Sequence, residues 1–453
     1  MKVAIVGGSH AAIACAWRLR EEDPSVEVEM FERKDQVSFV SQTIPLFLMG
    51  RADICHQANY TNPAELTMEG INVHINTEVS KIDISGKTLT AKTKDDKFSK
   101  EYTFDKLVMA TGSYPNLPPT GGELNKTLFL LKNFEDAFST EEFLKNAKHV
   151  IVVGGGLVGV EMARIIRNRK IEVTIIQSNE YVLDRYLDPE VAEHIEKQLE
   201  LEGIKVLLHT RATHYETHKS GFMKKPSITV TTDKGDTLTG DGVIMSVGLH
   251  PDSYLVSGQL TLGDRGAILV DEYMHASKED VFAIGDCSTT YLNLLDENIY
   301  NPHASDAIRQ GEIAALNILG FDRKIAPTQG TYKFNMERYF IATTGITKKD
   351  AVANGYNVDS VMCTNTYLNS DLYSAMNLVY EHGSHKILGF QVLGSVDISP
   401  YVNIVSLAID QGMSIEDIEF TDFYFEHGYK NPLGFARILA KMVRQKVKAD
   451  EAE

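Results

Sequence analysis

Short apolar runs, each followed by a turn of small residues and an amphipathic stretch, recur along the chain. Residues 3–6 form such a run, and the small residues after it lead into a stretch predicted to be helical over about residues 10–22. Residues 26–31 then alternate between apolar and polar positions, as a strand does. The opening of the chain is therefore predicted to be a βαβ unit.

The same pattern returns further along the chain. Residues 150–153 are continuously apolar, which is typical of a buried parallel strand, and residues 173–176 predict the next strand. The glycine-rich turns of the two units begin at Gly7 and Gly154, which is too wide a spacing for a solenoid repeat. The pattern therefore indicates two related domains.

Together with the remaining segments, this pattern predicts an α/β fold. The fold would contain two Rossmann-like (doubly wound) dinucleotide-binding domains and a C-terminal α+β domain. From about residue 327 the chain becomes richer in β-type segments. Further strands and helices are predicted near residues 107–113, 243–248, 281–286, 304–319, 402–411 and 433–447.

Composition and charge exclude several classes of protein. The 453 residues are 43% hydrophobic, as folded proteins are, and a formal net charge of −17 argues against nucleic acid or a membrane as partner. No apolar run reaches the ~18 residues of a membrane span, and the N-terminal apolar run is interrupted too early for a secretory signal. The four cysteines and 14 histidines show no metal-site spacing, so we expect no metal and a reducing, cytoplasmic location.

The clearest chemical signal is Gly154-x-Gly156-x-x-Gly159 between a buried strand and a helix. The first glycine permits a tight turn, the second lets the backbone approach a pyrophosphate, and the third allows close packing of helix on strand. The helix N-terminus then attracts the phosphate charge. In this context the pattern predicts a dinucleotide site, and the plain alternative is a structural turn.

The first unit is less regular, because Ser9 and Ala12 stand where glycines are usual. Glu32 ends its second strand 25 residues after Gly7, where a carboxylate accepts hydrogen bonds from a ribose. Gln177 ends the equivalent strand of the second unit, and a neutral amide neither repels a ribose 2′-phosphate nor pairs with it. The choice between NADH and NADPH therefore stays open, although the absence of Arg or Lys directly after the strand favours NADH.

Two dinucleotide folds in one chain indicate a flavin enzyme that a nicotinamide reduces. Motifs along nearly the whole chain point the same way, namely residues 7–12, 32–33, 38–41, 110–113, 131–133, 154–161, 186–188, 247–251, 283–286, 309–311 and 422–425. With them the chain resembles the FAD flavoproteins of the pyridine nucleotide-disulfide oxidoreductase family, in particular NADH oxidase, NADH peroxidase and coenzyme A-disulfide reductase.

The resemblance implies a division of the chain and two cofactor sites. It implies an FAD-binding domain at residues 1–119 and 247–325, an NAD(P)-binding domain at 120–246, and a dimerisation domain at 326–453 that forms a homodimer. FAD is expected at Gly7, Gly8, Ser9, His10, Ala11, Glu32, Arg33, Gln42, Val79, Ala110, Thr111, Gly112, Lys132, Asp286, Ala304 and Ser305. NAD(P)H is expected at Gly154, Gly156, Leu157, Val158, Gly159, Glu161, Gln177, Tyr186 and Gly248. Phe425 is expected to approach the partner's flavin, with a core aromatic as the alternative.

One departure from the family changes the expected chemistry. The redox cysteine of the family follows Ser-Phe-x-Ser, and at that position this chain has Gln42, with Thr43 in place of the next glycine. A glutamine amide forms no sulfenate and no mixed disulfide, which argues against peroxidase and disulfide-reductase chemistry. Cys287, next to Asp286, is the nearest candidate for a substitute sulfur, and a buried structural cysteine is the alternative.

His10 and Gln42 are the predicted catalytic residues. A protonated His10 would stabilise negative charge as electrons pass to dioxygen, and Gln42 would hydrogen-bond the flavin ring or a substrate. A purely structural His10 is the alternative. The sequence thus predicts an FAD-dependent NAD(P)H oxidase without a redox cysteine, forming peroxide or water. The competing hypotheses are an NAD(P)H-dependent reductase of another acceptor (a quinone, an electron carrier or peroxide) and a low-turnover flavin redox sensor.

Overall fold

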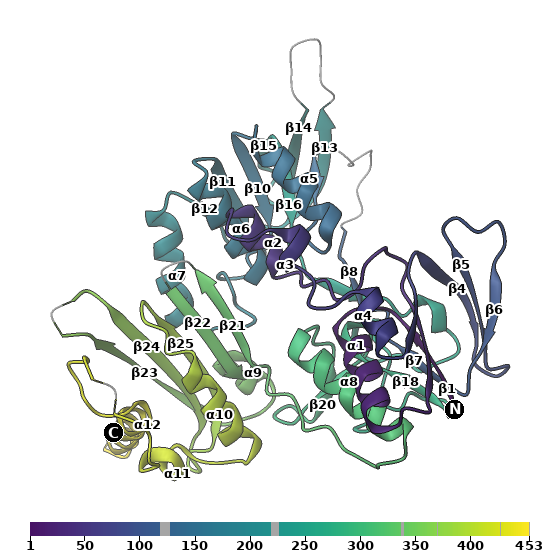
Figure 1. Cartoon of the computed structure of the whole chain (residues 1–453). Coiled ribbons are helices and arrows are strands. Elements are labelled where there is room, and N and C mark those ends of the chain that lie inside the picture. Colours follow the sequence, from purple (N-terminus) through teal and green to yellow (C-terminus); the bar gives the residue numbers. More distant parts are fainter. Residues whose placement is uncertain (118–126, 219–225, 337–338, 369, 426, 453) are drawn as a thin grey trace.

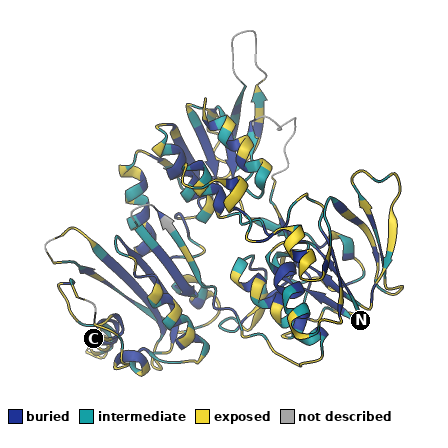
Figure 2. Cartoon of the chain, viewed as in Figure 1, coloured by how far each residue is buried: buried dark blue, intermediate teal, exposed yellow. Residues whose placement is uncertain are grey.

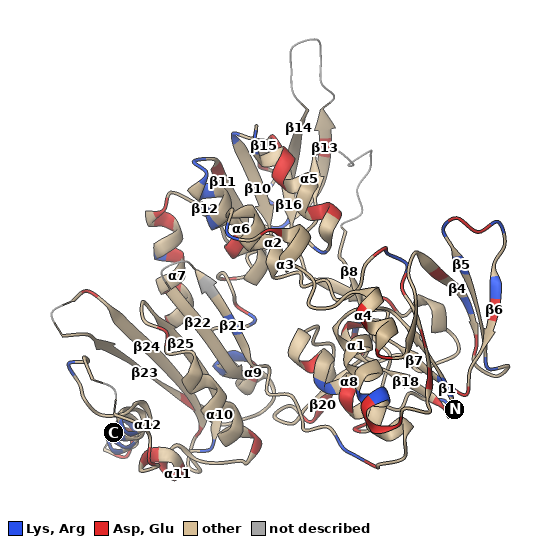
Figure 3. Ribbon diagram, in the orientation of Figure 1, with Lys and Arg blue, Asp and Glu red and all other residues tan. Residues whose placement is uncertain are grey.

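The computed structural model describes residues 1–117, 127–218, 226–336, 339–368, 370–425 and 427–452. Figure 1 shows three domains, and the first of them combines the purple start of the chain with a green segment that returns to it after the second domain. Among the described residues, no helix is both long enough and apolar enough to cross a membrane. Acidic and basic side chains are interspersed over all three domains (Figure 3).

The first domain is built on a parallel sheet with the strand order β18-β7-β1-β2-β3. Ile5 of the central strand pairs with Met30 on one side and Val108 on the other. Helices α1 and α8 cross closely on this sheet, because a Cβ at Gly311 would lie 2.4 Å from the carbonyl oxygen of Ala11. The elements are β1 (Lys2–Val6), α1 (His10–Glu22), β2 (Glu27–Phe31), β3 (Ile71–His74), β7 (Lys106–Met109), β18 (Val281–Ala283) and α8 (Ala304–Ile318).

The second domain repeats this design with a parallel sheet in the order β12-β11-β10-β16-β9. Each of the two domains also carries a three-stranded antiparallel sheet, β4-β5-β6 in the first and β13-β14-β15 in the second. The main elements are β9 (Leu128–Phe129), α5 (Phe134–Leu144), β10 (His149–Val153), α6 (Leu157–Asn168), β11 (Glu172–Ile176), α7 (Pro189–Leu201), β12 (Lys205–Leu207) and β16 (Gly242–Met245). The added sheets are β4 (Thr77–Asp83), β5 (Thr88–Thr93), β6 (Lys100–Thr103), β13 (Ala212–His218), β14 (Ser227–Thr232) and β15 (Thr237–Gly240).

The chain crosses between these domains twice, and the two crossing segments pair as β-strands. β8 (Ser113–Pro115) leaves the first domain and β17 (Leu249–Pro251) returns to it as an antiparallel partner. The rings of Tyr114 and His250 stack there with centroids 5.1 Å apart. The boundary predicted at residues 119 and 120 lies outside the described residues.

The third domain is a five-stranded antiparallel sheet with helices on one face (Figure 1). Successive residues of a strand face opposite sides, and in β25 Val392 packs with the helices while Leu393 packs with the core of the second domain. Both faces are therefore covered, and Figure 2 shows the central strands as buried. The elements are β21 (Tyr332–Met336), β22 (Tyr339–Gly345), β23 (Val358–Thr366), β24 (Tyr373–Glu381), β25 (Ile387–Gly394), α10 (Pro400–Asp410), α11 (Ile415–Glu419) and α12 (Phe435–Asp450).

A short helix of the first domain, α2 (Thr43–Leu48), is held by the second domain. Ile44 and Leu48 are buried in the same core as the strands of the second sheet. Arg169 of the second domain donates hydrogen bonds to the carbonyl oxygen of Leu48 and, at 2.6 Å, to Glu141. The residue before α2, Gln42, is thereby fixed where the two domains meet.

Candidate active site

The loop after β1 forms a cradle for a phosphate. Gly7 has a φ of +127°, and a Cβ there would lie 2.0 Å from the carbonyl oxygen of Ala110, so this crossing requires glycine. Ser9 at the N-cap of α1 makes no capping hydrogen bond, which leaves the N–H groups of the first turn available to an anion. Glu32 accepts a hydrogen bond from the N–H of Gly8 at 2.8 Å, and so its carboxylate lies beside the loop. This arrangement fits a pyrophosphate and its ribose.

Asp286 forms hydrogen bonds with residues that are distant from it in the sequence. Its Oδ2 accepts hydrogen bonds from Ser113 Oγ at 2.7 Å and from Lys132 Nζ at 3.2 Å. Gly112 has a φ of +74°, and no atom lies within 4 Å of the position that its Cβ would take. The hydroxyl of Thr111 donates to the carbonyl oxygen of Asp252. These residues meet beyond the carboxyl ends of β7 and β18, where open parallel sheets bind their ligands, and the polar, open space fits FAD.

His10, the first residue of α1, contacts Tyr60, a residue that the sequence analysis missed. Nδ1 of His10 lies 3.1 Å from the hydroxyl oxygen of Tyr60, and the two rings stack with centroids 5.5 Å apart. Burial raises the pKa of Tyr60 to about 12, so its hydroxyl keeps its proton and can hydrogen-bond with Nδ1. No motif marks Tyr60, which lies 50 residues from His10 in the sequence.

The surroundings of His10 shift its pKa against the protonated form that the sequence analysis expects. Burial lowers the pKa of His10 below its usual 6.5; Asp286 acts in the opposite direction, and Lys132 lowers the pKa further. The lowered pKa favours the neutral imidazole, whose tautomer depends on whether Nδ1 accepts from the hydroxyl of Tyr60 or donates to it.

Gln42 lies at the N-cap of α2 with an exposed side chain. This side chain makes no hydrogen bond to any residue that the structure describes, and its expected partners, the flavin ring or a substrate, stay a prediction. An exposed amide can bond to water. The position of the family's sulfur is thus taken by a side chain that faces the solvent.

The cysteines offer no replacement for that sulfur in the core. Cys287 is fully buried, its Sγ donates to the carbonyl oxygens of Ile284 at 3.3 Å and Met109 at 3.4 Å, and burial raises its pKa. Burial likewise raises the pKa of Cys15 to about 12 and that of Cys363 to about 11. Such thiols are not nucleophilic thiolates at neutral pH, so these residues pack as small apolar side chains. Cys55 is exposed.

The loop after β10 repeats the phosphate cradle. Gly154 has a φ of +104°, and a Cβ there would lie 2.2 Å from the carbonyl oxygen of Ser246. A Cβ at Gly159 would lie 1.9 Å from the carbonyl oxygen of Gly154. Gly156 at the N-cap of α6 has no atom within 4 Å of its Cβ position. The protein's own packing requires Gly154 and Gly159, whereas Gly156 keeps space open for a ligand.

Other predicted residues of the second site border this loop. Leu157 and Val158 form the first turn of α6, and burial raises the pKa of Glu161, one turn further along, to about 7. The segment that contains Tyr186 is tied to the loop, because the N–H of Leu183 donates to the carbonyl oxygen of Gly155 at 2.8 Å. Tyr186 itself contacts Tyr332 of the third domain edge to face, with ring centroids 4.9 Å apart. Gly248, with a φ of +89°, turns the chain out of this domain.

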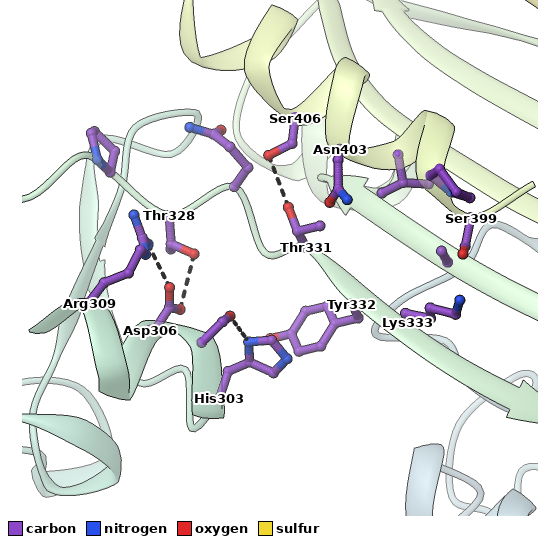
Figure 4. Close-up of a pocket in the computed structure, with 16 residues that line it drawn as sticks. His303, Asp306, Arg309, Thr328, Thr331, Tyr332, Lys333, Ser399, Asn403 and Ser406 are labelled. Atoms are coloured by element: carbon purple, nitrogen blue, oxygen red, sulfur yellow. Dashed lines mark hydrogen bonds and ion pairs between the residues drawn. The ribbon is translucent and has the colours of Figure 1, made fainter. Parts of the chain in front are cut away.

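A cavity of about 640 Å³ lies beside the first turn of α8, which holds the predicted Ala304 and Ser305 (Figure 4). Its other walls come from β21 and α10 of the third domain. Buried Asp306 accepts hydrogen bonds from Arg309 at 2.6 Å and from Thr328 at 3.1 Å. The cavity is therefore polar and connects predicted flavin residues with the dimerisation domain.

Three predicted residues make other contacts. Val79 is buried in the core of the first domain, and Arg33 lies 3.5 Å from the carboxylate of Asp252. Phe425 is 70% exposed on the third domain, beside a groove that also contains Phe420 and Tyr424. Phe425 is not brought to the flavin residues of its own chain, so its expected role would need a second copy.

The fold and the two cradles define an oxidoreductase of the two-dinucleotide class. The protein-family model for pyridine nucleotide-disulphide oxidoreductases matches residues 1–311 of the sequence. The family model for their dimerisation domain matches residues 334–426. The chain belongs to the pyridine nucleotide-disulphide oxidoreductase family. The predicted fold, enzyme class and cofactors, FAD and NAD(P)H, are confirmed.

Several relatives match over almost their whole length. The chain is 32% identical to an NADH oxidase of Enterococcus faecalis over 97% of its own length and 99% of that relative. It is 28% identical to an NAD(P)H coenzyme A polysulfide/persulfide reductase of Pyrococcus horikoshii, covering 94% of each chain. The structure resembles that of the water-forming NADH oxidase of Lactobacillus brevis bound to NADH, with a TM-score of 0.94, 30% identity and full coverage of both chains. An engineered water-forming NADPH oxidase gives the same values.

Proposed function

We propose that this protein is an FAD-dependent NAD(P)H oxidase that reduces dioxygen without a redox cysteine. The observation that carries the proposal is His10, which contacts Tyr60 and interacts with Asp286 and Lys132, in a site where Gln42 stands at the position of the sulfur. The names of the relatives in Enterococcus faecalis and Lactobacillus brevis support an oxidase. FAD bound at this site would supply the chemistry that transfers electrons from the nicotinamide to dioxygen.

The protein's own groups have separate tasks in this scheme. The loops at Gly7 and Gly154 hold the two pyrophosphates at helix N-termini, and Glu32 accepts from the flavin ribose. Lys132 neutralises Asp286 and fixes its orientation. Nε2–H of His10 donates a hydrogen bond to the negative charge that develops on the reduced oxygen, while Tyr60 keeps that nitrogen protonated.

Hydrogen peroxide is the product that we propose. A two-electron transfer from NADH and one proton to dioxygen gives NAD⁺ and peroxide, and further reduction of peroxide by a sulfur is excluded at position 42. The test mixes the purified flavoprotein with NADH in air and records NADH, oxygen and peroxide together. Equal consumption of NADH and oxygen with equal formation of peroxide is expected. Fast NADH consumption without oxygen uptake would sink the oxidase proposal in favour of a reductase of another acceptor.

We further propose a homodimer in the cytoplasm. The match to a dimerisation domain and the exposed aromatic residues Phe420, Tyr424 and Phe425 support self-association. In such a dimer Phe425 would contact the partner's flavin. Light scattering of the purified protein tests the dimer, and a monomer at micromolar concentration would refute it.

A further inference from the structure

Arg169 connects the second domain to the short helix that follows Gln42. It is the C-cap residue of α6, at the opposite end of that helix from the phosphate cradle. One guanidinium nitrogen, Nη2, donates to the carbonyl oxygen of Leu48 and, at 2.6 Å, to the carboxylate of Glu141. Because this nitrogen carries two hydrogens, it can make both bonds at once. The contact therefore joins α5 and α6 of the second domain to the last residue of α2.

The bond from Arg169 completes the C-terminal end of α2. The last four carbonyl groups of an α-helix have no partner within the helix. In α2 three of them accept from backbone N–H groups that follow directly in the chain, those of Met49, Gly50 and Arg51. The fourth, that of Leu48, accepts from Arg169, which is 121 residues away in the sequence. The second domain thus supplies the one partner that the adjoining backbone does not.

α2 needs such external support because it is short. Its six residues are well below the ~12–15 that an isolated helix requires in water. Ile44 and Leu48 are buried in the core of the second domain, and the ring centroid of Phe47 lies 5.3 Å from that of Phe138 on α5. Figure 1 shows α2 beside α6. Apolar burial has no direction of its own, whereas the hydrogen bond from Arg169 requires a specific distance and angle, and so it fixes where α2 lies on this surface.

We propose that Arg169 is a positioning residue for Gln42. Gln42 directly precedes α2, so a shift of the helix moves the predicted catalytic amide with it. Arg169 lies one length of α6, about 18 Å, from the phosphate cradle, and is therefore not expected to contact NADH. The second domain thus has a task besides binding the nicotinamide dinucleotide, because it holds the residue that stands at the position of the sulfur. The inference rests on the proposed function, since it concerns the reaction with dioxygen at that same site.

Hydrogen exchange of the purified flavoprotein, followed by mass spectrometry, tests the positioning without turnover. In Arg169→Ala the amides of residues 44–51 should exchange about 10-fold faster, as expected when a hydrogen bond to a charged group is lost. Arg167→Ala is the matched control, because Arg167 lies at the same end of α6 but donates to the carbonyl oxygen of Glu202 within the second domain. The control should leave the exchange of α2 unchanged.

Stopped-flow kinetics of the two half-reactions test whether this position matters for the chemistry. Arg169→Ala should slow reoxidation of the reduced enzyme by dioxygen roughly 5-fold, because a displaced group loses its alignment with the reacting atoms. The rate of flavin reduction and the KM for NADH should stay unchanged. In a Gln42→Ala background Arg169→Ala should slow reoxidation no further, since the two residues act through one amide. Arg169→Lys keeps a cationic donor and should restore part of the wild-type rate.

A second variant covers the case in which Arg169→Ala folds poorly. Glu141→Gln keeps the donor to Leu48 but removes the charge that orients it, and should give a smaller increase in the exchange of α2. The proposal is overturned if neither variant changes this exchange, or if Arg167→Ala changes it as much as Arg169→Ala. It is also overturned if Arg169→Ala slows reoxidation equally with and without Gln42, or not at all. Absence of oxygen reduction by the wild type, with the expected exchange in every variant, would refute the proposed function alone.

Discussion

The hydroxyl oxygen of Tyr60 lies 3.1 Å from Nδ1 of His10, and we expect this hydroxyl to donate to Nδ1, which leaves the imidazole proton on Nε2. The two residues come from different elements, since His10 begins α1 and Tyr60 follows α3 (Ile54–Gln57). Trp17 also contacts the ring of Tyr60, with ring centroids 6.0 Å apart. The pair therefore has a fixed geometry, and its chemistry can be tested by removing a single oxygen atom.

Replacing Tyr60 with Phe keeps the stacking and removes the donor to Nδ1. We expect reoxidation of the reduced enzyme by oxygen to slow by about 10-fold, in line with one lost hydrogen bond, while reduction by NADH is unchanged. Stopped-flow absorbance separates the two half-reactions, and ¹⁵N NMR should show His10 losing its preference for the Nε2–H form. Tyr291→Phe, which removes a hydroxyl bonded to Asp296 at the surface, is the matched control. An unchanged tautomer in Tyr60→Phe would contradict the assignment.

His10 should act in its neutral form. Because burial lowers its pKa below 6.5, the rate of reoxidation should be constant from pH 7 to pH 8 and change only as the ring gains a proton at lower pH. In His10→Ala this pH dependence should disappear, and reoxidation should slow on the order of 10²-fold with little effect on reduction. A rate that rises steadily as the pH falls from 8 to 6 would instead favour a protonated imidazole.

Gln42→Cys places a thiol at an exposed position that the second domain holds in place. We expect the variant to reduce added peroxide with NADH, because a thiolate can form the sulfenate that an amide cannot. Anaerobic NADH consumption after addition of peroxide is the measurement, and Gln42→Ser is the control. Since Cys55 is also exposed, both variants should be made in a Cys55→Ser background. A thiol that titrates without any gain in peroxide reduction would show that Thr43 misplaces it.

Gly156→Ala separates ligand binding from folding. Gly156 has no atom within 4 Å of its Cβ position and a φ of −78°, so alanine should leave the thermal unfolding temperature nearly unchanged. A methyl group at this point meets the pyrophosphate instead, and NADH affinity should fall by about 10-fold or more. Gly434→Ala, at another open glycine far from the loop, should change neither quantity. If Gly156→Ala lowered the unfolding temperature as clearly as the NADH affinity, the claim that Gly156 serves ligand binding and not folding would be refuted.

Asp188 should make the contact between the second and third domains sensitive to pH. It is almost fully buried, accepts from Lys348, Asn377 and Gln391, and burial raises its pKa to about 6. The folded state thus holds the proton more tightly than the unfolded chain, with its ordinary pKa near 3.8. The stability from this proton is complete below that value and is lost as the pH rises through about 6.

Scanning fluorimetry from pH 4 to pH 7 tests this coupling. The unfolding temperature of the wild type minus that of Asp188→Asn should decrease as the pH rises over this range, because the asparagine cannot lose a proton. Glu172→Gln, at an exposed site, should give a constant difference. A difference for Asp188→Asn that is independent of pH would exclude a role for this proton.

Both dinucleotide loops were predictable because their signals are local. Gly7 and Gly154 have positive φ, and each stands between one strand and one helix, so the short segment itself specifies the turn. The absence of a cysteine at position 42 is likewise evident from the sequence alone. Family motifs extended this to Asp286 and Lys132, which the structure joins by a hydrogen bond.

The sequence by itself therefore determined the two dinucleotide folds, the family and the missing sulfur. Only the tertiary structure decided the surroundings of His10, the exposure of Gln42 and the hydrogen bond between Gln177 and Asp184. Each of these depends on groups that only folding brings together. Tyr60 contacts His10, α2 packs on the second domain, and Asp184 accepts a hydrogen bond from Gln177. Burial and hydrogen-bond partners set the charge of such groups, and no spacing along the chain specifies them.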